Sequence, residues 1–121
     1  MTALVLLLDQ FPRNAFRDTV RMYATDPMAR DVANAAIERG YDNLVDPQLR
    51  FFFYLPFAHS ESLADQDRSV ELHERIAFTE HAIGHRDIVK RFGRFPHRNG
   101  ILGRPSTAEE LAFLKEGGFG G

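Results

Sequence analysis

The chain has 121 residues, of which 44% are hydrophobic and 26% charged, with no cysteine and a formal net charge of −2. This length suits one domain with a single core, in which the 11 phenylalanines should be prominent. The lack of cysteine excludes disulfides and thiolate chemistry, and together with the lack of a leader segment it predicts a cytoplasmic protein. No apolar run approaches the roughly 20 residues of a membrane span, and the net charge argues against a nucleic-acid partner.

Two helices are expected before residue 25. A short apolar helix over residues 2–8 should be ended by Pro12, because proline removes a backbone hydrogen bond and clashes with the preceding turn. Residues 15–24 are expected to form a second helix, with Phe16, Val20 and Tyr23 on one face.

Two Asp-Pro pairs predict the next helix starts, because an acidic N-cap followed by proline suits a helix N-terminus. Asp26-Pro27 should open a helix over residues 27–39, with Gly40 as its stop. Asp46-Pro47 should open another, which Pro56 truncates.

The second half of the sequence is expected to form one long helix, a loop and a final short helix. The long helix is expected from Ser62 to Ala82, kinked at Gly84 and continued to Gly93, with Leu63, Val70, Ala77 and Phe78 facing inward. Residues 94–105 hold two prolines and two glycines and should form a loop. Thr107 and Glu110 form a capping-box pattern that opens a helix over residues 108–116, followed by a frayed tail, residues 117–121, in which Phe119 is the only anchor. The chain is thus predicted to be a single all-α domain, residues 1–121, of at least five helices. Short turns between its helices suggest a tetratricopeptide-like array of antiparallel pairs.

Charge is distributed unevenly along the second half. Residues 59–80 carry a net charge of −4, whereas residues 85–104 carry +5. We expect the loop over residues 94–104 and the segment 59–66 to face one another across a polar cleft. The alternative is that the two segments simply pack together and neutralise each other.

The residues from Arg91 to Arg104 are the first candidate site. Four arginines and a histidine, with Gly and Pro shaping the backbone, could clamp a carboxylate or phosphate through forked hydrogen bonds. The alternative is that these arginines bond nearby carbonyls and acids and hold the loop. The candidate ligand-binding residues are Arg91, Arg94, His97, Arg98, Asn99, Arg104 and Gln66.

Three residues are candidates for acid–base chemistry: His59, Glu61 and His97. Helix capping explains the neighbouring Ser60 or Ser62 equally well. His81 and His85 have the spacing of metal ligands on a helix, but no third ligand stands out, so neither a metal nor a cofactor is predicted.

An internal echo links the two ends of the chain. Residues 9–14, with the sequence DQFPRN, resemble residues 94–99, with the sequence RFPHRN, and each segment follows an expected helix end. Chance similarity is the other explanation.

Three segments resemble a bacterial family, domain-of-unknown-function family 924. They are LLLDQFPRN (residues 6–14), YLPFAHSESLADQDRSV (54–70) and RFGRFPHRNGILGRPSTAEELAFL (91–114), in the family's order. The resemblance implies an all-helical, tetratricopeptide-like fold and brings no known reaction. It also implies that helices usual before Leu6 are missing, so that this chain is the C-terminal portion of the usual domain. The apolar residues Leu4–Leu8 are then expected to be covered by a second copy in a homodimer.

These observations leave three functions open. The first is binding of a small anionic ligand at the Arg/His-rich loop. The second is an enzyme of unknown reaction that uses His59 or His97 as acid–base. The third is a tetratricopeptide-like protein-interaction scaffold.

Overall fold

A computed structural model of the chain describes residues 2–15, 17 and 19–117, and these contain only helices and turns. The all-α class is therefore confirmed within this part of the chain. The α-helices are α1 (Thr2–Ala15), α2 (Asp26–Glu38), α3 (Pro47–Ala58), α4 (Leu63–Glu74), α5 (Glu80–Phe92), α6 (Asn99–Leu102) and α7 (Ala108–Lys115). Three 3-10 helices lie between them: η1 (Val20–Tyr23), η2 (Tyr41–Leu44) and η3 (Pro96–Arg98).

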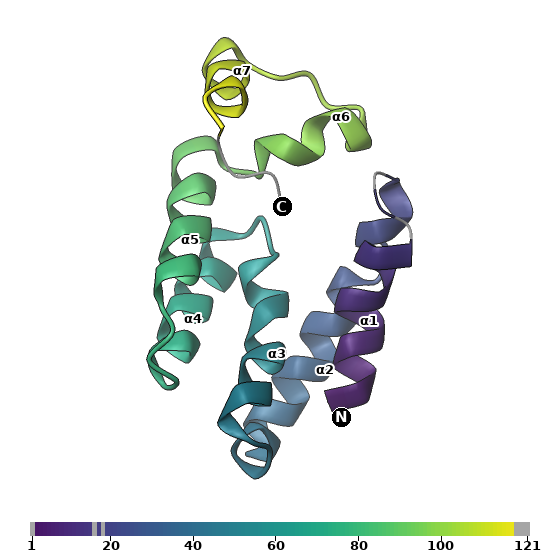
Figure 1. Cartoon of the computed structure of the whole chain (residues 1–121), viewed down its shortest axis with the longest axis vertical. Helices are drawn as coiled ribbons and strands as arrows, with labels where there is room; N and C mark the ends of the chain where they lie inside the picture. Colours follow the sequence, from purple (N-terminus) through teal and green to yellow (C-terminus); the bar gives the residue numbers. More distant parts are fainter. Residues whose placement is uncertain (1, 16, 18, 118–121) are drawn as a thin grey trace.

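The first five helices pack side by side in chain order, and α1 also contacts α3 (Figure 1). Helices α1 to α4 share a core that contains Val5, Ala33, Ala36, Phe53, Tyr54, Phe57 and Leu72. The two alanines are fully buried, so α2 presents a small surface on which its neighbours can pack closely. Helices α6 and α7 lie together at one end of the molecule, beyond the C-terminal end of α5 (Figure 1). Consecutive helices are paired as expected, while the tetratricopeptide-like superhelix stays a prediction.

The prediction that Pro12 ends the first helix is wrong, because α1 continues through Pro12 to Ala15. Proline at position 12 has no N–H to offer the carbonyl of Leu8, four residues earlier. The hydroxyl of Thr25 donates to that carbonyl instead, at 2.6 Å. A side chain from the start of α2 thus supplies the hydrogen bond that the proline removes.

The prediction of a helix over residues 15–24 is also wrong, since η1 alone is helical among the described residues between α1 and α2. Continuation of α1 to Ala15 leaves a short connection, and a 3-10 turn is what such a connection accommodates. Phe16, predicted to face inward, lies outside the described residues.

The long helix predicted from Ser62 is two helices, because the chain turns between Glu74 and Glu80. Ala77 has a φ of 53° in this turn, and the N–H of Phe78 donates to the carbonyl of His73. Leu63, Ala77 and Phe78, which were predicted to face inward, are exposed, while Val70 is buried as expected. Gly84 lies inside α5 and does not break it.

Pro56 does not truncate α3, which extends to Ala58. The other helix signals are confirmed: both Asp-Pro pairs stand at helix starts, and Gly40 and Gly93 follow helix ends with φ of 73°. The capping box of Thr107 and Glu110 is present.

The predicted loop over residues 94–105 contains the helical turns η3 and α6. Residues 118–121, including Phe119, lie outside the described residues, so the frayed tail stays a prediction. None of the described helices has the length and apolar character needed to cross a membrane.

Candidate functional site

A pocket of about 280 Å³ lies where the C-terminal half of α1 faces the end of α3 and the segment η3–α6. Figure 1 shows these elements around one end of the molecule. The pocket is lined by Gln10, Arg13, Asn14, Arg17, Met22, Tyr23, Leu55, His59, His85, Phe95, His97, Arg98 and Ile101. No acidic residue is among them, so the wall combines cationic, neutral polar and apolar side chains.

Arg98 is the buried cation of this pocket, with only 7% of its surface exposed. Its Nη2 donates to the carbonyl of His59 at 2.6 Å, whereas its buried Nε has no hydrogen-bond partner. The guanidinium carbon lies 4.3 Å from the ring centre of Tyr23 and 4.7 Å from that of Phe95. Burial lowers the pKa of Arg98, an effect that Asp26 and Glu61 oppose only from a distance, since Arg98 forms no ion pair with a described residue.

His59 is held by a buried carboxylate. Its Nδ1 lies 2.8 Å from Oδ1 of Asp9, which is 1% exposed. Burial would raise the pKa of Asp9, but hydrogen bonds and charges from His59 and Arg13 outweigh it, so the pKa is lowered and the group is a carboxylate. His59 caps the C-terminus of α3, which places its ring between α1 and the pocket.

Arg13 is neutralised by the acids around it. Its Nη1 and Nη2 form a fork onto Asp26, at 2.6 and 2.9 Å, and Nη1 also contacts Asp9. Arg17 is exposed and forms no ion pair with a described residue. Arg98 is therefore the buried positive charge of the pocket that no carboxylate of a described residue pairs with.

Two further histidines line the pocket in neutral form at pH 7. The pKa values of His85 and His97 are lowered to about 4, in both cases mainly by burial and partly by the charge of Arg98. Their rings therefore add no charge to the pocket.

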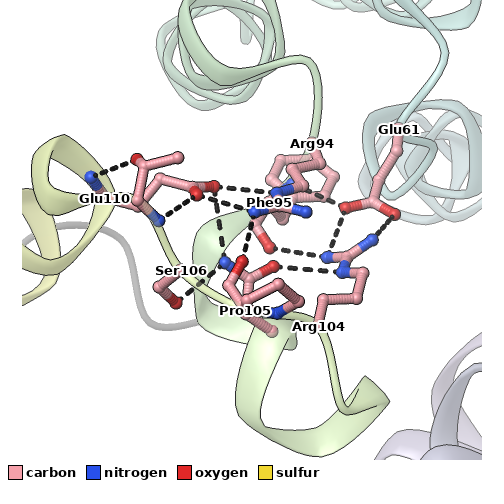
Figure 2. Close-up of polar contacts among 9 residues, drawn as sticks. Glu61, Arg94, Phe95, Arg104, Pro105, Ser106 and Glu110 are labelled. Carbon is pink, nitrogen blue, oxygen red and sulfur yellow. Dashed lines mark hydrogen bonds and ion pairs between the residues drawn. The ribbon is translucent and has the colours of Figure 1, made fainter.

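The rest of the candidate loop is held by a network of its own. Figure 2 shows Arg104 forked onto Glu61, with Nη1 and Nη2 at 2.8 and 3.0 Å from the two carboxylate oxygens. Glu61 also accepts from the backbone N–H of Phe95 at 2.6 Å, and Nε of Arg104 donates to Asn99. Hydrogen bonds and the charge of Arg104 lower the pKa of Glu61 although burial opposes them.

A second ion pair ties this loop to α7. Arg94 donates to both carboxylate oxygens of Glu110, at 2.9 and 2.7 Å, and to the carbonyl of Pro105 (Figure 2). These bonds from Arg94, with the capping bond from Thr107, lower the pKa of Glu110 to about 2. Arg94 and Arg104 thus hold the loop, which is the alternative that the sequence left open for them.

The remaining candidates also lie outside the pocket. The side-chain amide of Gln66 donates to the carbonyls of Ala58 and Ser60, at 2.8 and 2.6 Å, and so fixes the turn after α3. Arg91 lies over the rings of Phe92 and Phe113. The two oppositely charged segments do lie together, but Glu61 and Arg104 join them directly.

Only three of the predicted site residues line the pocket: His59, His97 and Arg98. Sequence reasoning missed the contribution of α1, namely Gln10, Arg13 and Asn14. The internal echo was the available signal, because its first copy supplies these three residues and its second copy supplies Phe95, His97 and Arg98.

The described residues contain no group of three or more His, Asp or Glu side chains that could hold a metal ion. His81 and His85, which have metal-ligand spacing, are joined by a bond between Nδ1 of His85 and the carbonyl of His81.

Comparisons with known proteins place the chain among uncharacterised relatives. The family model described as "Bacterial protein of unknown function (DUF924)" matches residues 1–118. The solved structure of the protein of unknown function ATU0120 from Agrobacterium tumefaciens is 58% identical, with a TM-score of 0.93 over 95% of this chain. This chain spans 66% of the length of that protein. No curated protein matches the chain.

Proposed function

The chain belongs to the bacterial family of unknown function DUF924, and we propose that it binds a small anion in the pocket beside Arg98. The observation that carries this proposal is a buried guanidinium that forms no ion pair with a described residue and whose Nε has no hydrogen-bond partner among them. A buried charge is costly unless it is paired, and the arginines of structural networks here, Arg94 and Arg104, are forked onto acids.

An anion would complete the interactions that Arg98 lacks. It would accept from the Nε–H of the guanidinium, which has no hydrogen-bond partner among the described residues, and offset the burial that lowers the pKa of Arg98. None of the described residues that line the pocket is acidic, so they do not repel an anion.

The test replaces Arg98 by methionine, which keeps much of the contact with Tyr23 and Phe95 but removes the charge. Thermal unfolding is measured with a panel of acetate, benzoate, phosphate and phenyl phosphate. We expect at least one anion to raise the melting temperature of the wild type, because a ligand at about 100 times its Kd stabilises the native state by about 2.7 kcal/mol. The Arg98→Met protein should lose that response.

Arg68→Met is the matched control, because Arg68 also lies over an aromatic ring, that of Phe57, but does not line the pocket. It should retain the anion response. The stability of Arg98→Met without ligand should equal or exceed that of the wild type. A loss of about 3–5 kcal/mol, as expected when a partner of a buried ion pair is removed, together with no response to any anion, would assign Arg98 a structural role instead.

A second candidate function is acid–base catalysis, and the contact between His59 and Asp9 favours it. A buried carboxylate on one ring nitrogen fixes the orientation and tautomer of a histidine, and leaves the other nitrogen for proton transfer. No described residue hydrogen-bonds to Nε2 of His59.

This candidate is tested with a nitrophenyl ester that carries a carboxylate. Hydrolysis by the wild type should fall in His59→Gln, while anion-induced stabilisation is retained. His73→Gln is the control, because His73 is fully buried outside the pocket. Equal rates of ester hydrolysis in all three proteins would show that His59 does not catalyse this reaction, so that only the binding function would stand.

A further inference from the structure

The residues that line the pocket indicate the shape and polarity of its ligand as well as its charge. Resting on the proposed function, we infer that the ligand is a small monocarboxylate with an apolar, ring-sized body. Three features of the pocket support this: the number of uncompensated buried charges, the way in which Arg98 is covered, and the apolar part of the wall.

The buried charge of the pocket matches one negative charge. Asp26 and Asp9 neutralise Arg13, and Arg17 is exposed to solvent. Both His85 and His97 are neutral at pH 7. Arg98 is thus left as one buried cation, and a dianion would bring a second charge out of water without a buried partner.

The covering of Arg98 favours a flat anion. The rings of Tyr23 and Phe95 lie against the guanidinium, so a ligand would have to bind along its hydrogen-bonding edge. One position on that edge already donates to the carbonyl of His59, and the buried Nε has no partner. A planar carboxylate matches such an edge through coplanar hydrogen bonds.

The apolar part of the wall indicates the body of the ligand. Five of the thirteen lining residues are apolar or aromatic: Met22, Tyr23, Leu55, Phe95 and Ile101. A bare inorganic ion would leave these side chains facing water. A volume of about 280 Å³ holds about nine water molecules, at about 30 Å³ each, which is room for a ring as well as a carboxylate.

The experiment compares four probes by calorimetry and by chemical-shift mapping on the wild-type chain: benzoate, acetate, phosphate and phenyl phosphate. We expect benzoate to bind at least about tenfold more tightly than acetate. The free energy gained by burying part of a phenyl ring exceeds that of a tenfold change in Kd. Benzoate should also bind more tightly than phenyl phosphate, which carries more charge. The largest shifts should map to Tyr23, His97 and Ile101.

The outcomes separate this inference from the proposed function. If acetate or phosphate binds as tightly as benzoate, or phenyl phosphate more tightly, the inference is wrong while anion binding stands. If none of the four probes binds, both fall. Ile101→Asn should reduce the preference for benzoate over acetate severalfold. Leu102→Asn, the neighbouring residue that does not line this pocket, should leave it unchanged. A preference that survives Ile101→Asn and shifts that map elsewhere would also overturn the inference.

Discussion

Nδ1 of His59 lies 2.8 Å from Oδ1 of Asp9, and this contact joins the C-terminus of α3 to the middle of α1 across 50 positions of the chain. Arg13, one turn further along α1, contacts the same carboxylate and forks onto Asp26 at the start of α2. One wall of the pocket is therefore fixed by acids that do not themselves line it.

We expect the ring of His59 to carry its proton on Nδ1 at neutral pH, because the carboxylate of Asp9 can only accept a hydrogen bond there. Asp9→Ala removes this acceptor, and the ring should move toward the tautomer protonated on Nε2. Nitrogen chemical shifts of the imidazole report the change. Asp65→Ala, which removes a carboxylate bonded to Ser60, should leave the tautomer of His59 as it was. An unchanged ring in Asp9→Ala would show that the contact does not orient His59.

The hydrogen bond from Thr25 to the carbonyl of Leu8 should contribute more to stability when residue 12 is proline than when it is alanine. Thr25→Val leaves that carbonyl without a partner and should lower the free energy of unfolding by about 1–3 kcal/mol. In Pro12→Ala, residue 12 regains an N–H that can bond the same carbonyl, so Thr25→Val should cost less in this background. Urea unfolding of the four proteins gives the coupling energy. Thr79→Val serves as the control, since the Thr79 side chain makes no capping bond. Additive effects of the Thr25 and Pro12 changes would refute the compensation.

Acidification should destabilise the fold through its buried histidines. The pKa values of His81, His85 and His97 are lowered from 6.5 to about 4, mainly by burial. Between these values the unfolded chain binds more protons than the folded one, so stability is fully present above pH 6.5 and is lost as the pH falls toward 4. Each histidine adds a slope of up to about 1.36 kcal/mol per pH unit.

Urea unfolding across this pH window should therefore show a shallower dependence in His81→Phe than in the wild type. Phe78→Leu changes the packing beside His81 without removing a titrating group, so its slope should match that of the wild type. A wild-type stability that is flat from pH 7 to 5 would contradict the lowered pKa values.

Self-association is expected through the outer face of α1. Leu4, Leu7 and Phe11 are spaced to share one helix face, and 42%, 54% and 54% of their surfaces are exposed. Burying such a stripe against a second copy removes apolar surface from water. Sedimentation at tens of micromolar should show a dimer that Leu7→Glu dissociates. Leu44→Glu, at an exposed leucine in η2, should have no effect. A monomer at every concentration would exclude the dimer.

The sequence by itself determined the helical class and those helix ends that are set by residues close together in the chain. Both Asp-Pro starts, the glycine stops at positions 40 and 93, and the capping box of Thr107 are where the sequence predicts them, because each depends on residues a few positions apart. The predicted involvement of His59, His97 and Arg98 in a site stays a proposal, but the fold places these three around one pocket.

Tertiary structure decided what depends on distant partners. Helix α1 continues through Pro12, and the hydroxyl of Thr25, at the N-cap of α2, donates to the carbonyl of Leu8 that the proline leaves without a partner. Clustered arginines look alike in sequence, yet Arg94 and Arg104 pair with Glu110 and Glu61, while Arg98 forms no ion pair within the described part of the chain. Only the packing of distant segments determines which charges come into contact.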